Sequence, residues 1–168
     1  MAQAARSGLI LAGLALLVVV GALWGWSAMT QPFPGKTTPP KCVATIVQEG
    51  EKVFPRRVTV SVFNASSRDG LAGRTMAEFI DAGFAEGTTG NAPRAAKVVR
   101  AAIWAPRPAS PDVRLVASRL GPATRVVRRN GPGVGVTVLV GNRYDRLVRG
   151  RPSVRSGQET EICSPPVL

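Results

Sequence analysis

The sequence predicts an α+β protein: an N-terminal transmembrane helix, then one small two-layer domain with two helices packed on one face of a four- to five-stranded sheet. An uncharged stretch of 22 residues runs from Gly8 to Met29. After it, short segments that alternate apolar and polar residues are interleaved with two segments of helical periodicity. Their order, strand, helix, strand, strand, helix, strand, strand, is typical of helices that share a sheet face.

The first segment is long enough to cross a bilayer. About 20 apolar residues, at about 1.5 Å rise each, span the roughly 30 Å hydrocarbon core. A cleaved secretory signal is the alternative, but its apolar core runs only about 7 to 15 residues. Trp24 and Trp26 suit a membrane interface. We therefore expect a cytoplasmic leader at 1–7 and an uncleaved transmembrane helix at 8–29.

The only two cysteines, Cys42 and Cys163, bracket the rest of the chain. A disulfide between them would close a loop of more than 100 residues. In the chain-entropy model, such a bond stabilises the folded state by about 4 to 5 kcal/mol because it restricts the unfolded chain. Such bonds persist only outside the reducing cytosol. Two free buried thiols are the alternative. The four prolines within 30–41 favour an extended spacer. We expect an extracytoplasmic domain at 42–163 and a tail at 164–168.

The domain begins with a strand, because Val58, Val60 and Val62 alternate with polar residues between Arg57 and Phe63. Four further strands are expected at 84–89, 96–104, 124–129 and 135–140. The region after 148 shows little periodicity, so we expect an irregular segment that leads back to the early cysteine.

An amphipathic helix of about three turns follows the first strand. Its apolar face comprises Leu71, Thr75, Met76, Phe79 and Ile80. Ser67 or Asp69 can cap its start, and Gly83 offers a stop. Free amides at its glycine-rich start can receive a phosphate or carboxylate, but we expect Ser67 and Asp69 to satisfy those amides.

A second helix has clear start and stop signals. Ser110 is a cap, Pro111 stands in the first turn, and Asp112 favours the helix dipole. Gly121 follows its last apolar residue. This helix lies between the expected strands at 96–104 and 124–129.

Several elements occur together in the order typical of one family. They are VTVSVFNASSRDGLAGRTMAEFIDAGF from Val58, GNAP at 90–93 and VTVLVGNRYDRL at 136–147. In this layout the sequence resembles the LytR C-terminal domain family. The motif residues are Asn64, Gly70, Leu71, Ala72, Gly83, Phe84 and Asn91. Residues 142–144 depart from the family, in which an acidic residue usually precedes the aromatic.

The resemblance implies a non-catalytic envelope domain, attached to or working beside the enzymes that join secondary polymers to peptidoglycan. No LytR-CpsA-Psr catalytic domain is present, so no transferase activity carries over. The chain also lacks histidine, which excludes His-based triads and His-containing metal sites. A Ser or Thr activated by Lys97 is the remaining catalytic alternative. We expect no enzyme activity, no metal and no cofactor.

The net charge of +12 suggests an anionic ligand, since all ten acids and all but one of the 22 Lys and Arg residues follow the apolar stretch. Arginine binds phosphate and carboxylate through a planar fork. The candidate anion-binding residues are Arg125, Arg128, Arg129, Arg143 and Arg146. Outside the membrane, the available polyanions are phospholipid headgroups and wall polymers, so we expect no nucleic acid. A GC-rich genome that places Arg on an ordinary solvated surface is the alternative.

Two functions follow. The first is a membrane-anchored scaffold for envelope-assembly proteins that supports cell-wall assembly or envelope integrity. The second is a binding module for an anionic glycolipid, a lipid-linked precursor or a wall polymer. Both place the protein in the plasma membrane as a single-pass protein with a cytoplasmic N-terminus. The sequence leaves the oligomeric state open.

Overall fold

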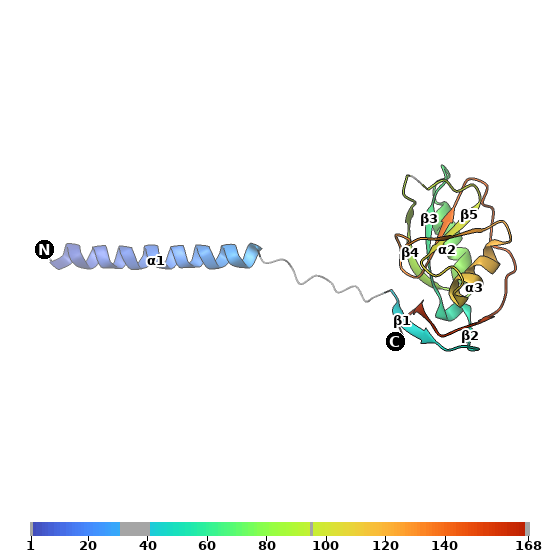
Figure 1. Ribbon diagram of the computed structural model, residues 1–168. Coiled ribbons are helices and arrows are strands. Elements are labelled where there is room, and N and C mark those ends of the chain that lie inside the picture. The colour runs from blue at the N-terminus through green and yellow to red at the C-terminus, as the bar shows by residue number, and fades with distance from the viewer. Residues whose placement is uncertain (1, 31–40, 95, 167–168) are drawn as a thin grey trace. The chain divides into compact units, whose positions relative to one another are not determined.

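The computed structural model describes residues 2–30, 41–94 and 96–166, which form two compact units, Met1–Thr38 and Pro39–Leu168 (Figure 1). The first unit contains one helix, α1 (Ala2–Thr30). Within the residues described, no helix combines the length and the apolar character that crossing a membrane requires. The predicted span at 8–29 is therefore not confirmed. Residues 31–40 of the predicted spacer and 167–168 of the predicted tail lie outside the described residues.

The second unit is built around a five-stranded mixed sheet with the order β4-β3-β7-β5-β6. Its strands are β3 (Thr59–Asn64), β4 (Ala85–Asn91), β5 (Ala101–Ala105), β6 (Arg125–Arg128) and β7 (Val136–Val140). β3 pairs in parallel with β4 and β7, whereas β5 pairs antiparallel with β7 and parallel with β6. Helix α2 (Leu71–Asp81) follows β3, and helix α3 (Pro111–Leu120) follows β5. The element order is the predicted one.

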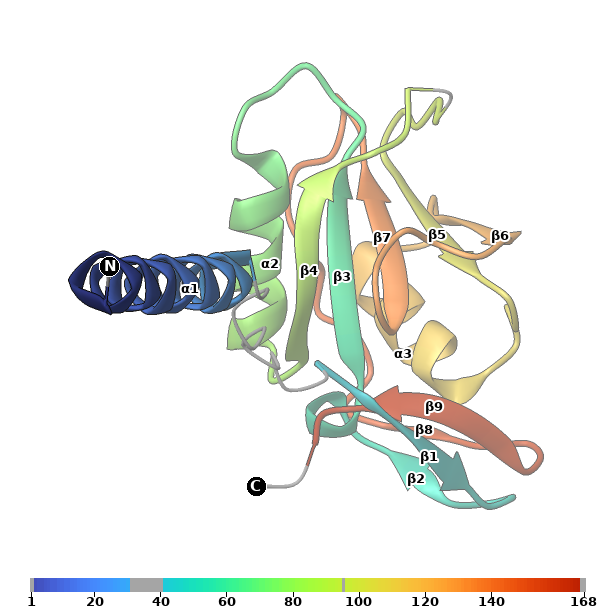
Figure 2. The same cartoon turned by 90° about the vertical axis from the view of Figure 1, so that its left-hand side faces the viewer.

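Both helices contribute to one apolar core on a single face of the sheet (Figure 2). The strands supply alternating residues, among them Val60, Val62, Ile103, Val138 and Val140, and the helices supply Met76, Phe79, Leu115 and Val116. The rings of Phe79 and Phe84 meet edge to face with centroids 5.3 Å apart. Each fully buried aliphatic or aromatic side chain contributes about 1.5–3 kcal/mol. The prediction of two helices on one sheet face is confirmed.

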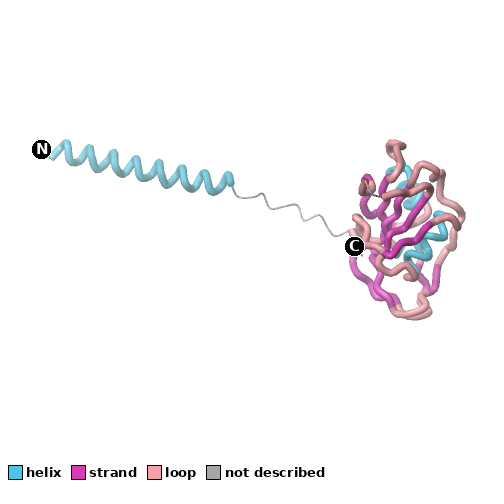
Figure 3. Tube along the Cα trace, turned by 45° about the horizontal axis from the view of Figure 1, so that its top comes forward, coloured by secondary structure: helices cyan, strands magenta, loops and turns pink. Residues whose placement is uncertain are grey.

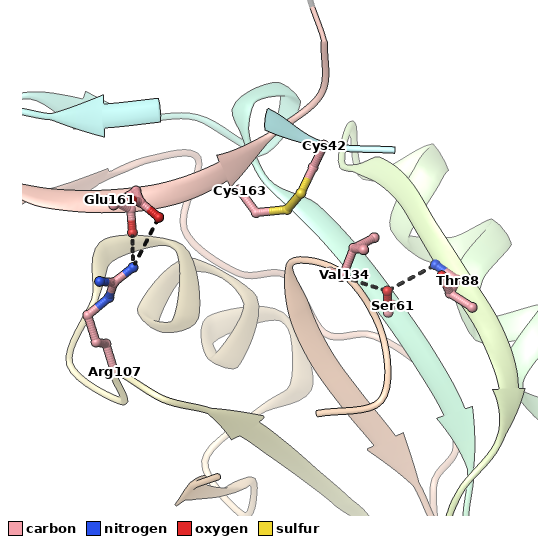
Figure 4. Close-up of a disulfide and its surroundings, with 7 residues drawn as sticks. All are labelled: Cys42, Ser61, Thr88, Arg107, Val134, Glu161 and Cys163. Carbon is pink, nitrogen blue, oxygen red and sulfur yellow. Dashed lines mark hydrogen bonds and ion pairs between the residues drawn. A yellow bond between two sulfur atoms is a disulfide. The ribbon is translucent and has the colours of Figure 1, made fainter. Parts of the chain in front are cut away.

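The loop between β6 and β7, residues 129–135, which we call the cover loop, lies against the opposite face of the sheet. Beneath it lie a small apolar cluster of Phe63, Trp104 and Leu139 and the buried hydroxyl residue Ser61. Ser61 Oγ donates to the carbonyl oxygen of Val134 (2.6 Å) and accepts the N–H of Thr88 (2.9 Å) (Figure 4). One side chain therefore ties the cover loop to two strands.

Two small antiparallel pairs join the ends of the domain. β1 (Val43–Val47) pairs with β9 (Thr160–Ser164), and β2 (Lys52–Val53) pairs with β8 (Val154–Arg155). Figure 2 shows them together beyond one end of the main sheet, and Figure 3 distinguishes the strands of this unit from its helices by colour. The prediction of an irregular segment after 148 is wrong where β8 and β9 form. These strands were hidden because their pairing partners lie about 100 residues earlier in the chain.

The Cys42–Cys163 disulfide is present and confirms the predicted bond (Figure 4). The two Cα atoms are 5.4 Å apart, and the residues are separated by 121 positions. Cys42 directly precedes β1, and Cys163 lies within β9. The bond therefore joins the point where the chain enters the domain to the strand by which it leaves.

Two predicted boundaries are wrong. The strand expected at 96–104 begins only at Ala101. Before it, the carbonyl oxygens of Val99 and Arg100 accept backbone N–H groups from the turn after β7. Neither Ser67 nor Asp69 caps α2: the residue before the helix is Gly70, whose φ of 71° is left-handed. The backbone N–H and hydroxyl of Ser67 instead donate to Asn142 Oδ1 at 3.0 and 3.1 Å. Gly83, with φ 87°, follows α2 as predicted.

Candidate functional site

Asn64, at the carboxyl end of β3, organises the loop that leads into α2. Its Oδ1 accepts the backbone N–H of Ser66 (2.9 Å) and the Ser66 hydroxyl (2.6 Å). Its Nδ2 donates to the carbonyl oxygen of Arg68 (2.7 Å). The amide group is therefore engaged on both sides in folding its own loop, and this family residue has a structural role.

A second set of contacts fastens this loop to the turn after β7. Arg68 Nη1 donates to the carbonyl oxygen of Tyr144 (2.6 Å). The Tyr144 hydroxyl donates to Glu78 Oε2 (3.1 Å), which also accepts the N–H of Leu147 (2.8 Å). Burial, and then the adjacent Glu78 carboxylate, raise the pKa of the Tyr144 hydroxyl. The phenol therefore stays neutral and remains a donor.

Five of the other six motif residues also serve the fold. Leu71, Ala72 and Phe84 are buried in the main core. Gly70 and Gly83 adopt positive φ, which L side chains rarely adopt. Asn91 is exposed at the end of β4, in register with Asn64.

A polar hollow of about 360 Å³ lies beside this corner, at the carboxyl ends of β3 and β4. Ligands often bind at that edge of parallel sheets. Here the lining residues include Asn64, Ser66 and Ser67, whose side chains are all engaged in the loop contacts above. Three other polar lining residues, Asp69, Asn91 and Arg94, make no side-chain hydrogen bond or ion pair in the described part of the chain.

The five predicted anion-binding arginines do not form one cluster. Arg129 stacks on the Trp104 ring, 4.3 Å from its centroid. Arg146 pairs with its chain neighbour Asp145 at 3.4 Å, both largely exposed, and such surface pairs contribute little. Arg143 follows β7, where its N–H donates to a backbone carbonyl. The remaining two, Arg125 and Arg128, stand on the edge strand β6 and line two different hollows.

Arg125 shares its hollow, of about 280 Å³, with Lys97 and Arg100. Neither serine nor threonine is among the described residues that line it. A nucleophile activated by Lys97 therefore finds no support in the geometry of this hollow.

Arg128 lines a hollow of about 320 Å³ at the start of α3, which we call the α3 hollow. Its wall also contains Arg107, Arg114, Ser110 and the turn that precedes β9. None of the described lining residues is acidic. The sequence analysis missed Arg107 and Arg114, because they lie more than ten residues from the arginine-rich segment that contains Arg128.

Three acids lie near the α3 hollow without lining it, and the first, exposed Glu159, stands between the lining residues Gln158 and Thr160. Glu161 accepts from Arg107 Nη2 through its carbonyl oxygen (2.8 Å), and its carboxylate lies 3.9 Å from the same nitrogen (Figure 4). Asp112 is buried and accepts a hydrogen bond from the Ser110 hydroxyl. Burial raises the pKa of Asp112, while hydrogen bonds from Ser110 and from the backbone of Val113 oppose the shift. The Asp112 carboxylate thus accepts hydrogen bonds from backbone N–H groups at the start of α3.

The comparisons with known proteins identify one family. The model of a family described as the LytR cell envelope-related transcriptional attenuator matches residues 57–144. The crystal structure of the soluble domain of a conserved hypothetical secreted protein from Mycobacterium marinum is similar, with a TM-score of 0.44 and 20% identity over 62% of this chain and 79% of that chain. No curated protein matches. Since the family model spans more than half of the sequence, the chain belongs to the LytR C-terminal domain family.

Proposed function

We propose that this chain is a membrane-anchored, extracytoplasmic protein of the cell envelope that acts as a non-catalytic scaffold for envelope-assembly proteins. Its family is described as cell envelope-related. The uncharged stretch from Gly8 to Met29 would supply the anchor. Residues 30–41 would hold the domain away from the bilayer.

The disulfide carries the extracytoplasmic part of this proposal. It closes a loop that contains the entire five-stranded sheet, and such bonds persist in oxidising compartments. In the chain-entropy model, a disulfide that closes a loop of about 100 residues raises the free energy of unfolding by about 4.7 kcal/mol. A domain that relies on this bond gains its full stability outside the cytosol.

The scaffold part rests on how the polar groups are used at the corner formed by the loop before α2 and the turn after β7. Asn64, Arg68 and Glu78 are engaged in folding the loop before α2 and the turn after β7. Because these hydrogen bonds fix the conformation of the loop and the turn, they support a rigid surface on which another protein can dock.

The test is crosslinking in cells, followed by purification through a tag on the carboxyl terminus. We expect envelope-assembly enzymes to be recovered with the full-length chain. The matched control carries the same anchor and spacer with an unrelated disulfide-bonded domain. Equal recovery with both chains, or recovery of no envelope protein, would contradict the scaffold.

Topology is tested separately on freshly isolated membranes. We expect Cys42 and Cys163 to resist alkylation until a reductant is added, and a protease outside the cell to remove the carboxyl-terminal tag. Thiols that react at once, together with a protected tag, would place the domain in the cytosol.

A second candidate function, a binding module for an anionic glycolipid, a lipid-linked precursor or a wall polymer, is favoured by one observation. The acid-free α3 hollow gathers Arg107, Arg114 and Arg128. Binding through these side chains would weaken as salt is added. Salt-independent binding of an anionic envelope polymer, or no binding, would count against this function.

A further inference from the structure

We propose that the α3 hollow is a binding site for a phosphate group. This inference deepens the second candidate function, on which it rests. Three arginines from three different segments line the hollow: Arg107 from the loop after β5, Arg114 from α3 and Arg128 from β6. Only the fold brings them together.

The hollow has the size and shape for a small charged group. Its volume of about 320 Å³ lies at the lower end of the roughly 300–1,000 Å³ typical of ligand pockets. The turn from Ser156 to Gln158 forms part of the wall. The Ser156 hydroxyl donates to the carbonyl oxygen of Gln158 (2.6 Å), which keeps this turn in place.

The three arginines retain donors for a ligand. The Arg128 guanidinium makes no hydrogen bond or ion pair with any residue in the described part of the chain. Arg114 Nη1 makes one long contact, 3.3 Å, to the carbonyl oxygen of Arg155. Arg107 is positioned by Glu161 through one nitrogen. Because each guanidinium carries five N–H donors, all three groups can engage an anion.

None of the neighbouring acids pairs with Arg114 or Arg128, and exposed Glu159, between Gln158 and Thr160 of the wall, makes no ion pair in the described part of the chain. Glu161 pairs with Arg107 alone, at 3.9 Å with both side chains more than half exposed, so solvent screens the interaction. Asp112 is turned toward Ser110 and the amides of α3. The start of the helix is therefore already occupied, and the charge of a ligand would be met by the arginine side chains.

The arrangement favours phosphate over a single carboxylate. A carboxylate presents two oxygens and engages one guanidinium fork well, whereas a phosphate presents up to four oxygens and can bridge several. The phosphate could belong to a phospholipid headgroup or to a soluble phosphate compound. Both offer the same chemistry to the three arginines.

The test uses the full-length chain in a neutral detergent at low ionic strength. Calorimetry with pyrophosphate measures a soluble phosphate, and co-sedimentation compares phosphatidylglycerol vesicles with phosphatidylcholine vesicles. The test variant is R114Q/R128Q. The matched control is R74Q/R149Q, which removes the same charge from two exposed arginines outside the hollow. R128Q alone is added because the Arg128 guanidinium has no described partner to lose, and thermal melting checks that each variant is folded.

We expect the wild-type chain to bind at least one of the two probes, with affinity that falls as salt rises. The affinity of R114Q/R128Q should drop on the order of tenfold for each guanidinium lost, while R74Q/R149Q should bind nearly as well as wild type. Loss confined to vesicles would assign the site to a lipid headgroup, and loss with pyrophosphate would assign it to soluble phosphates.

Two results would overturn the proposal: no binding of either probe by the wild-type chain, or equal weakening of the test and control variants. If the chain still binds an anionic wall polymer while R114Q/R128Q behaves like the control, the second candidate function stands. Only the location of the site is then wrong.

Discussion

The two faces of the main sheet are covered in different ways. On one face, α2 and α3 bury large apolar side chains such as Phe79 and Leu115. On the other, the cover loop approaches the strands so closely that a Cβ on Gly133 would lie 2.4 Å from Ser61 Cβ. The helix-covered face is stabilised by the burial of large apolar side chains. The loop-covered face depends on glycines, which let the loop backbone approach the strands, and on the hydrogen bonds of Ser61.

This difference predicts which substitutions each face tolerates. Removing volume should damage the helix-covered face, where side chains fill the space between two layers. Adding volume should damage the loop-covered face, where backbone lies against strand. Each prediction below is measured as the free energy of unfolding in urea.

The largest effect is expected for Phe79→Ala. Phe79 is fully buried and packs edge to face on Phe84, so its removal leaves a cavity and should cost about 3–5 kcal/mol. Ile80→Ala is the control, since its neighbour Ile80 is 45% exposed on the same helix. Equal losses from the two variants would contradict a core held by apolar volume on this face.

A smaller loss is expected for Gly133→Ala on the opposite face. The new methyl group would also lie 2.8 Å from Phe63 Cε2, and overpacking of this kind costs about 1–3 kcal/mol. Gly157→Ala is the control, because nothing lies within 4 Å of a Cβ there. If both variants keep wild-type stability, the cover loop does not pack as tightly as described.

A smaller, pH-dependent effect is expected for Asp112→Asn beside the helix-covered core. Burial raises the folded-state pKa of Asp112 above its ordinary value of 3.8. The unfolded chain therefore loses this proton first, and the contribution of Asp112 to stability falls as pH rises from 3.8 through the folded-state pKa. The free energy of unfolding of D112N relative to wild type should therefore rise as the pH increases from below 3.8 through the raised folded-state pKa of Asp112.

The control for this trend is Asp81→Asn, which removes an exposed carboxylate at the end of α2. A difference between D112N and wild type that stays constant over the pH range would show that Asp112 ionises as readily in the folded state as in the unfolded chain.

The smallest effect is a gain. Gly73 lies exposed within α2, and nothing lies within 4 Å of a Cβ placed on it. Gly73→Ala should stabilise the domain by about 0.5–1 kcal/mol, because alanine loses less backbone entropy in a helix. Gly87→Ala makes the same exchange within β4, where the Cβ would lie 2.4 Å from Ser61 Oγ, and should lower stability. A loss in both variants would contradict an open helix surface at Gly73.

Local sequence signals predicted the main sheet and its helices, and they could not predict the rest. Alternating valines predict which face of β3 is buried. The start and stop signals predict both ends of α3 to within one residue. β2 and β8 have only two residues each and pair across about 100 positions, too short to show periodicity. The cover loop was missed for a related reason: its glycines matter only because the sheet lies beneath them.

The candidate site shows the same limit. The disulfide was predictable because the chain has two cysteines at the ends of its foldable region. The α3 hollow was not, because counting arginines along the chain groups Arg128 with Arg125 and Arg129, which the fold directs to other surroundings. Arg107 and Arg114 join Arg128 only because α3 packs against β5 and β5 pairs with β6.

The disulfide also sets the path of mechanical tension. A pull on the chain at residue 41 passes from Cys42 directly to Cys163 and β9. Glu161, two residues before Cys163, accepts the Arg107 contact at the edge of the α3 hollow. Force applied at residue 41 therefore has a short route through the S–S bond to β9 and does not need to separate β3 from its neighbouring strands.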